Sequence, residues 1–527
     1  MRAWYSIIIM FLLGGLAPKA SGQELAKLVA SDAAEEDYFG RSVAVSGDLV
    51  VVGANQNDAA GIDSGSVYVF RTTNGGASWT QVAKLVASDA AADDEFGGSV
   101  AVSGDLVVVG ADENDAAGSA YVFRTTNGGA TWTQTAKLLA SDAAAGDRFG
   151  YSVAISGDLV VVGAFYDDDA GSNSGSAYVF RTTNDGASWT QVAKLVASDA
   201  AATDYFGYSV AVSGDLVVVG AYGNDDAGSK SGSAYVFRTT NDGASWTQVA
   251  KLVASDAAAS DYFGRSVAVS GDLVVVGAYG NGDAGIGSGS AYVFRTTNDG
   301  ASWTQVAKLV ANDAAAYDYF GDSVAVSGDL VVVGAWGNAD AGDWSGSAYV
   351  FRTTNDGASW TETAKLVACD AAAADSFGES VAISGDLVVL GARLNDDAGS
   401  GSGSAYVFRT TNGAVTPTCG SSTASAVNMI VVVAAVVAAV VAVAIVCVCI
   451  KRRRTKAAAA RADFNVEAPP DRDDAFAGDG LETRSVKELK AEAQIQASTG
   501  ASNVAGAARH SASTKTPSAP PASASFA

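Results

Sequence analysis

The side chains that could do chemistry gather in short segments that follow an apolar run ending in Gly-Ala. Most of these side chains are carboxylates or aromatic rings. The segments are NQNDAAGID, DENDAAG, FYDDDAGSN, YGNDDAGSK, YGNGDAGIG, WGNADAGDW and RLNDDAGSG. Aromatic rings beside carboxylates suit sugars or a cationic protein patch. The segments are therefore a candidate surface for binding a glycan or a protein.

A second variable position follows each of seven Phe-Gly pairs. It holds Arg41, Gly98, Tyr151, Tyr208, Arg265, Asp322 or Glu379. Diversity on a constant frame is expected where loops make contacts, although loops also drift when nothing constrains them. From the two positions together we take seven candidate ligand contacts: Tyr166, Tyr222, Tyr279, Trp336, Trp344, Arg41 and Arg265.

Runs of Asp in the same segments supply the oxygen ligands that Ca²⁺ prefers. They include Asp167, Asp169, Asp225 and Asp226, whose spacing is not diagnostic of a calcium site. We therefore expect no cofactor and no metal, with Ca²⁺ at these four carboxylates as the alternative.

The chain holds a single His, His510, close to its C-terminus. The repeats consequently have no His for acid–base catalysis, nucleophilic triads or zinc binding. Paired carboxylates remain an alternative, but near-identical copies supply like residues where a catalytic site needs unlike ones. The GSGSA segments lack the Lys and the strand-then-helix context of a phosphate loop. We expect a non-enzymatic protein.

An internal repeat defines the elements that must position these residues. The Phe-Gly pairs recur mostly every 57 residues, at Phe39, Phe96, Phe149, Phe206, Phe263, Phe320 and Phe377. Each unit carries four β signals: SVAVS, which stops at a Gly-Asp turn, LVVVGA, AYVFRTT and TQVAKLVAS. Four short strands repeated seven times predict an all-β seven-bladed β-propeller at residues 23–412.

The two ends of the array are complementary. The chain enters the array with ELAKLVASD, a fourth strand without the first three, and leaves it with three strands that lack a fourth. We predict that the N-terminal strand completes the last blade, so that no sheet edge stays free. Successive connections then alternate between two faces, and the variable segments share one of them.

Two segments outside the repeats predict a membrane topology. Residues 1–22 have a basic Arg2, a short apolar run and small residues near the end, which is typical of a signal peptide. Residues 428–450 include the 22-residue uncharged run Met429–Ile450 and are followed by KRRRTK, which predicts a transmembrane helix with its C-terminal side inside. We expect a type I plasma-membrane protein, with a stalk at 413–427 and a disordered cytoplasmic tail at 451–527.

Net charge argues against one class of partner, and the cysteines leave one disulfide open. Residues 23–427 hold 48 acidic and 19 basic residues, a net charge of −29 that argues against a nucleic-acid partner. Cys369 and Cys419 lie on the predicted outside, where a disulfide is permitted, and whether they pair stays open.

Units of the form FGxSVAVSGDLVVVGA resemble FG-GAP repeats, the units of the integrin α-subunit propeller. The resemblance implies the propeller fold and a role in recognition or adhesion. Integrin α chains have leg domains that are missing here, and their calcium blades carry an Asp-x-Asp-x-Asp-Gly loop where this chain has only Ser46–Asp48. The family's calcium sites are therefore not carried over.

The hairpins ending in Trp79, Trp132, Trp189, Trp246, Trp303 and Trp360 are similar to the Asp-box of sialidases, with Asn184 at the Asp position of one. The resemblance implies a structural turn, and the Arg after each YVF recurs as a structural residue would, so a sialidase-like hydrolase is disfavoured. Our prediction is a cell-surface recognition or adhesion protein with an extracellular protein or glycan ligand. A surface-coat protein without a specific ligand is the alternative.

Overall fold

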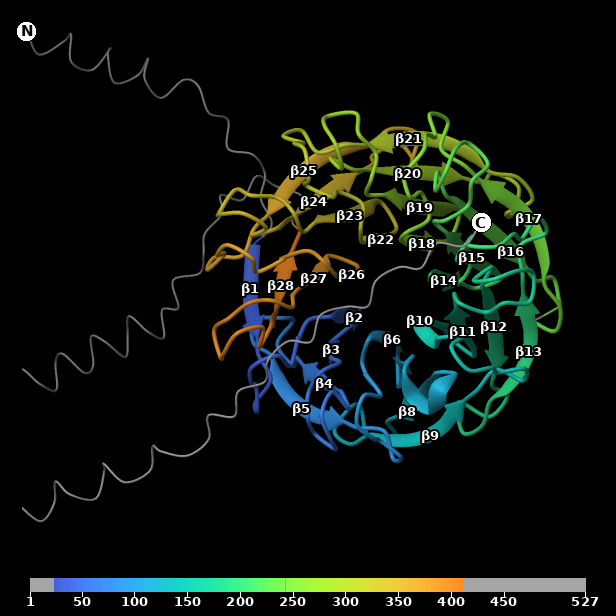
Figure 1. The fold of residues 1–527 in the computed structure, drawn as a ribbon. Coiled ribbons are helices and arrows are strands. Elements are labelled where there is room, and N and C mark those ends of the chain that lie inside the picture. The colour runs from blue at the N-terminus through green and yellow to red at the C-terminus, as the bar shows by residue number, and fades with distance from the viewer. Residues whose placement is uncertain (1–22, 242, 411–527) are drawn as a thin grey trace, which may run out of the picture. The chain divides into compact units, whose positions relative to one another are not determined.

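Seven four-stranded antiparallel sheets surround a common axis in the computed structural model, which describes residues 23–241 and 243–410 (Figure 1). The chain divides into two compact units, and all described residues belong to the first, Met1–Ile430. The sheets confirm the predicted all-β, seven-bladed propeller. We number the blades in chain order, so that blade 7 contains both the last strands and the first one.

The innermost strand of each blade comes first in the following lists. Blades 1 to 3 consist of β2 (Ser42–Ser46), β3 (Leu49–Ala54), β4 (Ser66–Arg71), β5 (Thr80–Leu85); β6 (Ser99–Ser103), β7 (Leu106–Ala111), β8 (Ser119–Arg124), β9 (Thr133–Leu138); and β10 (Phe149–Ser156), β11 (Leu159–Ala164), β12 (Ser176–Arg181), β13 (Thr190–Leu195). Blades 4 to 6 consist of β14 (Ser209–Ser213), β15 (Leu216–Ala221), β16 (Ser233–Arg238), β17 (Thr247–Leu252); β18 (Val267–Ser270), β19 (Leu273–Ala278), β20 (Ser290–Arg295), β21 (Thr304–Leu309); and β22 (Val324–Ser327), β23 (Leu330–Ala335), β24 (Ser347–Arg352), β25 (Thr361–Leu366). Blade 7 consists of β26 (Val381–Ser384), β27 (Leu387–Ala392), β28 (Ser404–Arg409) and β1 (Gln23–Leu28), and a 3-10 turn, η1 (Asn114–Ala116), interrupts one connection.

Burial along the strands follows the sequence pattern. The second strand of every blade, such as LVVVGA in β3, is buried at all six positions because neighbouring blades cover both of its faces. The outermost strand, such as TQVAKL in β5, is mostly half-buried. Each hydrophobic core lies between two adjacent blades, as where Val51 of β3 packs in one cluster with Phe96 and Val107 of the next unit.

The N-terminal strand closes the ring as predicted. Strand β1 pairs with β28, with Lys27 opposite Tyr406 and Leu28 opposite Ala405 (Figure 1). Leu28 is 3% exposed and belongs to the core between blades 7 and 1. The first and last strands of the propeller therefore share one sheet, and that sheet packs like the other six.

Pairs of glycines set the distance between neighbouring blades. A Cβ on Gly53 would collide with the carbonyl oxygen of Gly97, the glycine of the next Phe-Gly pair, and Gly391 of blade 7 meets Gly40 of blade 1 in the same way. The Ser42 hydroxyl donates to the Gly97 carbonyl at 2.8 Å. The same bond recurs at 2.8 or 2.9 Å in Ser99–Gly150, Ser152–Gly207, Ser209–Gly264, Ser323–Gly378 and Ser380–Gly40.

The Phe of each Phe-Gly pair packs in the hydrophobic core between the two blades that the glycine contact joins. Phe39 is fully buried, and its ring meets Tyr68 at 5.5 Å and Phe70 at 6.0 Å in edge-to-face geometry. Aromatic pairs favour this arrangement because the positive ring edge faces the negative ring face. The Phe thus fixes the start of the innermost strand, and the glycine after it permits the close approach of the two backbones.

The segments expected beyond the repeats fall outside the described residues. These are the signal peptide (1–22), the stalk (413–427), the transmembrane helix (428–450) and the tail (451–527). Within the described ranges, no helix has both the length and the hydropathy to cross a membrane. Cys369 is disulfide-bonded, and Cys419, whose pairing with it the sequence leaves open, lies outside the described residues.

The glycine contact predicts a large, position-specific effect. In Gly220→Ala the new methyl group would collide with the Gly264 carbonyl, so we expect the free energy of unfolding to fall by about 3 kcal/mol. Gly214→Ala is the control, because its Cβ meets nothing within 4 Å and only its φ of +55° opposes the change, at about 1 kcal/mol. Chemical denaturation measures both, and equal losses would contradict the proposed contact.

Ring closure predicts a local opening mode. Leu28→Ala removes a buried side chain from a strand that no hairpin joins to its partner β28, so we expect the amides of β1 and β28 to exchange hydrogen faster than those of other blades. Leu85→Ala, equally buried at the same position of blade 1, lies in a continuous hairpin and is the control. Hydrogen exchange by mass spectrometry compares the two. Uniform exchange in both variants would show that closure is no weaker than a hairpin.

Candidate functional site

The variable connections gather on one end of the ring, which we call the variable face. The connection after the second strand of one blade ends beside the Phe-Gly pair of the next, as the parallel bridges Gly65–Phe96 and Gly175–Phe206 show. The constant Ser-Gly-Asp and Thr-Thr-Asn-Asp-Gly turns lie together on the opposite end, which we call the constant face. The predicted division between the two ends is therefore correct.

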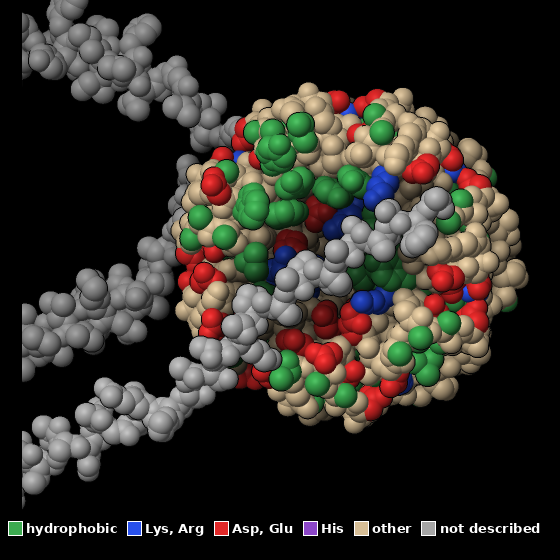
Figure 2. Space-filling model, viewed as in Figure 1, with side chains coloured by type: hydrophobic (Ala, Val, Ile, Leu, Met, Phe, Trp, Pro, Cys, Tyr) green, Lys and Arg blue, Asp and Glu red, His purple; other side chains and the backbone are tan. Residues whose placement is uncertain are grey.

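The position after each Phe-Gly pair lines a cavity of about 280 Å³ on the axis of the ring. Figure 2 shows a hollow there with both basic and acidic side chains around it. Arg265 Nε donates to Asp322 Oδ1 at 3.0 Å, and Arg41 pairs with Glu379 at 3.2 Å. The Tyr151 hydroxyl donates to the Tyr208 hydroxyl at 2.6 Å. The axial cavity therefore carries charged and hydroxyl groups, and its opposite charges are paired between neighbouring blades.

Aromatic rings form a continuous curve around four blades of the variable face, which we call the aromatic arc. Its neighbouring ring centroids are 4.8 to 6.2 Å apart, in the order Tyr166, Tyr205, Tyr222, Tyr262, Tyr279, Tyr319, Trp336 and Trp344. Within blades 4, 5 and 6 the rings stack, for example Tyr319 on Trp336 at 4.8 Å. Tyr166 and Trp344, at the two ends, are 37% and 53% exposed.

On the other side of the ring the same positions form polar contacts between blades. The Arg393 guanidinium lies 5.5 Å from the Tyr38 ring, and the Asn55 amide donates to Glu95 at 2.9 Å. Arg148 reaches Asp112 at 3.4 Å. The variable positions are therefore paired across six of the seven junctions of the described propeller, and the pairs are aromatic in one part of the ring and polar or charged in the other.

Of the seven predicted contacts, six come together. Tyr166, Tyr222, Tyr279, Trp336 and Trp344 belong to the aromatic arc, and the Arg265 guanidinium lies 5.7 Å from the Tyr222 ring and 5.3 Å from the Tyr279 ring. Arg41 lies apart from the arc, on its Glu379 partner in the axial cavity.

The prediction missed the tyrosines that precede three of the Phe-Gly pairs. Tyr205, Tyr262 and Tyr319 supply one ring of each stacked pair in the arc. Their signal was available in the sequence, because the same position holds Glu95, Arg148 or Ser376 in other units and so varies between copies. Tyr151, Tyr208, Asp322 and Glu379, noted as variable but not chosen, line the axial cavity.

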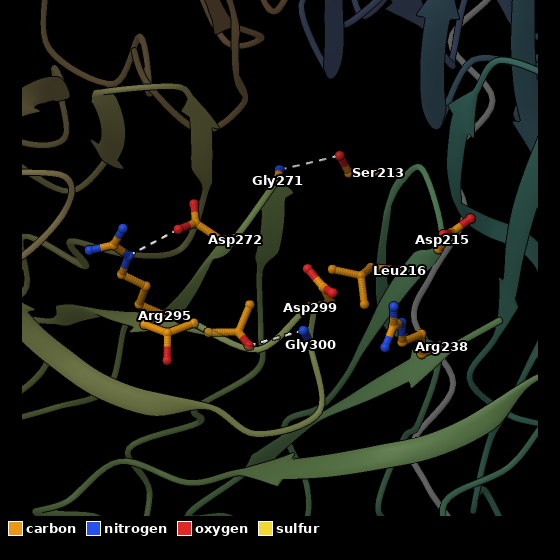
Figure 3. A pocket seen from close by; sticks show the side chains of 11 residues that line it. Ser213, Asp215, Leu216, Arg238, Gly271, Asp272, Arg295, Asp299 and Gly300 are labelled. Atoms are coloured by element: carbon orange, nitrogen blue, oxygen red, sulfur yellow. Dashed lines mark hydrogen bonds and ion pairs between the residues drawn. The ribbon is translucent and has the colours of Figure 1, made fainter. Parts of the chain in front are cut away.

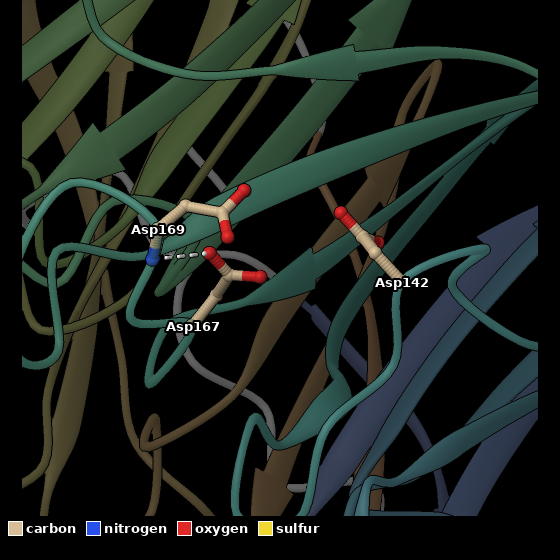
Figure 4. A group of neighbouring side chains, drawn as sticks. All are labelled: Asp142, Asp167 and Asp169. Atoms are coloured by element: carbon tan, nitrogen blue, oxygen red, sulfur yellow. Dashed lines mark hydrogen bonds between the residues drawn. The ribbon is translucent and has the colours of Figure 1, made fainter.

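Two of the four carboxylates considered for Ca²⁺ do approach each other. Asp167 and Asp169 lie with Asp142 so that one oxygen of each is within 4.8 Å of the others (Figure 4). The Lys194 ammonium forms ion pairs with all three, at 2.7 Å to Asp142 and 3.1 Å to Asp167. A resident ammonium therefore contacts all three carboxylates and offsets one of their three negative charges. In blade 4 Asp226 pairs with Lys251, while Asp225 accepts the backbone N–H of Lys230 at 2.6 Å.

The lysine contact recurs in every blade and we call it the lysine clamp. Each Lys of an outermost strand lies 5.1 to 5.5 Å from the centre of a Tyr ring. It binds an Asp in the connection that follows the outermost strand of the preceding blade. It also binds acceptors in the 2–3 loop of its own blade, the connection between the second and third strands. The seven lysines are Lys27, Lys84, Lys137, Lys194, Lys251, Lys308 and Lys365. The clamp therefore ties both variable connections to the rigid sheet.

The constant face holds repeated shallow pockets between blades. One of about 670 Å³ lies between blades 4 and 5, and Figure 3 shows Arg295 Nε bonded to Asp272, at 2.9 Å, at its edge. The neighbouring hairpin closes on itself, since the Thr296 hydroxyl accepts the N–H of Gly300 at 2.9 Å and Trp303 Nε1 donates to the Gly300 carbonyl at 3.2 Å. These bonds give the Asp-box-like segment the structural role expected of it.

The lysine clamp predicts a pH-dependent contribution to stability. Burial alone raises the pKa of Asp199, but the hydrogen bond and charge of Lys251 outweigh burial and hold the pKa below the ordinary value of 3.8. A lowered acid pKa stabilises the fold above the ordinary value, and this contribution is lost as the pH falls through the folded-state pKa. Because the Asp199 side chain is 43% exposed, Asp199→Asn should cost no more than about 1 kcal/mol near neutrality.

The measurement is the unfolding free energy of both proteins at several pH values. We expect the cost of Asp199→Asn to shrink towards zero below the folded-state pKa. The control is Asp225→Asn, which keeps the hydrogen bond to the Lys230 amide and forms no ion pair with Lys251. A cost that stays constant with pH would contradict the charge interaction.

Comparison with known proteins places the chain. The FG-GAP repeat family matches it seven times, at residues 23–70, 79–123, 132–180, 189–237, 246–294, 303–351 and 360–408. No curated protein matches the chain. Among solved structures it is similar to Sqt1 of Saccharomyces cerevisiae, at 12% identity and a TM-score of 0.40 over 74% of this chain and 100% of that one, a likeness too remote to carry an argument. Since the seven matches cover more than half of its length, the chain belongs to the FG-GAP repeat family.

Proposed function

We propose that this protein is a cell-surface recognition or adhesion protein whose variable face binds an extracellular protein or glycan. The observation that carries the proposal is the aromatic arc, which presents large rings at Tyr166 and Trp344 on an otherwise acidic propeller. Between these two exposed rings the six other rings of the arc are half-buried, so the arc is a continuous, partly exposed aromatic surface of the kind that meets a partner. FG-GAP propellers fit a ligand-binding or adhesion role in general.

The lysine clamp and the glycine contacts support this assignment of faces. They hold the ends of every variable loop against the sheets, so the side chains of the arc are presented on a rigid support. A rigid support lowers the entropy lost on binding, which favours recognition. The constant face offers the same residues at every junction and closes its Arg and Asp onto each other.

The proposed topology rests on the sequence. The signal-like segment at 1–22 and the apolar segment at 428–450 would put the propeller outside the cell and the tail inside, as a type I protein of the plasma membrane. A surface-coat protein is the second candidate, since the variable positions also pair with each other. The proposed activity is binding without a reaction, since the carboxylates Asp322 and Glu379 of the axial cavity are each paired with an arginine.

Cell adhesion tests the proposal. The full chain is displayed on cultured cells, its exposure is verified by protease accessibility, and attachment to other cells and to extracellular matrix is counted. The double variant Tyr166→Asn, Trp344→Asn removes two exposed rings and suits the left-handed backbone at Trp344, whose φ is +58°. We expect it to reduce attachment by about tenfold, since exposed aromatic anchors dominate interfaces.

The matched control changes exposed residues of the opposite end of the ring: Thr183→Ala, Thr297→Ala and Thr354→Ala. This variant should attach like the unmodified protein. No attachment above that of cells without the protein would overturn the recognition role and favour the surface coat. Equal losses in both variants would overturn the assignment to the variable face.

A further inference from the structure

A second cavity opens on the variable face at one end of the aromatic arc. Its volume is about 350 Å³, and residues of blades 2 to 5 line it: Asp112, Arg148, Tyr151, Phe165, Tyr166, Tyr208, Tyr222 and Arg265. Cavities that hold small ligands range from about 300 to 1,000 Å³, so this one suits a ligand of one or two rings. We call it the arc cavity.

Aromatic side chains form most of its walls. Phe165 lies 4.4 Å from Tyr151 and 5.3 Å from Tyr208, and Tyr208 meets Tyr222 at 4.6 Å, all between ring centroids. These contacts fix the orientation of each ring, with Phe165 only 5% exposed and Tyr166 open to solvent at the rim. The cavity is thus a preformed set of aromatic faces.

Polar groups stand among these rings. Asp112 is 9% exposed and Arg148 is its cationic neighbour. Arg265 uses its Nε on Asp322, and no other described residue hydrogen-bonds its two terminal nitrogens. Burial raises the pKa of Tyr208 well above its ordinary value, so its phenol keeps a proton that it can donate, since it already accepts one from Tyr151.

Charge narrows the class of ligand. A cationic group would meet Arg148 and Arg265 inside the cavity. An anionic chain would meet Asp112 and a propeller that holds 48 acidic against 19 basic residues. A neutral ligand with several hydroxyl groups and an apolar ring face escapes both penalties. It can stack on the tyrosines while Asp112 accepts, and Arg265 and Tyr208 donate, hydrogen bonds.

We propose that the arc cavity binds a neutral sugar residue of a glycan chain, with the chain continuing along the aromatic arc. This inference rests on the proposed recognition function and names its ligand class. Tyr166 supplies a stacking face at the rim, and Asp112 selects for hydroxyl donors. Tyr222 lines the cavity, and the rings that follow it in the arc extend the platform beyond the cavity: Tyr262 lies 6.1 Å from Tyr222, and Tyr279 stacks on Tyr262 at 5.0 Å.

Glycan binding by the purified full-length chain in mild detergent tests the inference. A printed array presents neutral oligosaccharides beside sialylated and sulfated ones, and calorimetry measures the affinity for the best neutral glycan. We expect neutral glycans to bind selectively. Tyr166→Asn should weaken the affinity by about tenfold, as the loss of one stacking face implies, and Asp112→Asn should weaken it by at least as much.

The matched control is Tyr317→Asn, the same change at a tyrosine that is 51% exposed near the far end of the arc. Its affinity for a short glycan should stay within about twofold of the unmodified protein. Binding of no neutral glycan, preference for charged glycans, or equal loss in both tyrosine variants would overturn the inference. Cell attachment that persists without glycan binding would leave the recognition function standing and reject only the sugar.

Discussion

The contact between glycines of neighbouring blades is the constraint on which the rest of the propeller depends. Gly97, which follows Phe96, and Gly53, near the end of the second strand of the preceding blade, approach so closely that neither can carry a side chain. Equivalent glycines meet at the other junctions. The Ser42 hydroxyl bonds across the same junction. Because this distance is the same at every junction, seven blades share one geometry, and the residue after each Phe-Gly pair is delivered to the axis.

The pattern of the sequence predicted the frame well because the frame is set by local signals. Apolar alternation, Gly-Asp turns and complementary ends specify strands, blade number and closure. The site was predicted less completely, because its contacts join positions that only the closed ring brings together. Tyr222 meets Tyr262 of the following unit at 6.1 Å, and no local pattern shows that contact. The lysine clamp was invisible for the same reason, since Lys194 binds Asp142, 52 residues earlier.

The residues that differ between copies on the variable face contact each other in pairs. At six of the seven junctions of the described propeller, the first residue of the connection between the second and third strands contacts the residue before the next Phe-Gly pair, as Asp112 contacts Arg148. Changing one partner alone would leave a buried charge or an unmatched ring, which costs free energy. This cost favours aromatic residues at both positions of a junction, as in Tyr222 with Tyr262 and Tyr279 with Tyr319. The resulting surface has an aromatic half and a polar half, which would give the proposed ligand a defined orientation on a nearly symmetric ring.

The offset between repeat and blade has a consequence for how such a protein can change in size. Each family match begins in the outermost strand of one blade and ends in the third strand of the next. If a whole 57-residue unit were gained or lost through recombination between near-identical coding segments, β1 would still find three strands awaiting a fourth. The number of blades is thereby independent of the means of closure, and the diameter of the axial cavity can evolve in whole-unit steps.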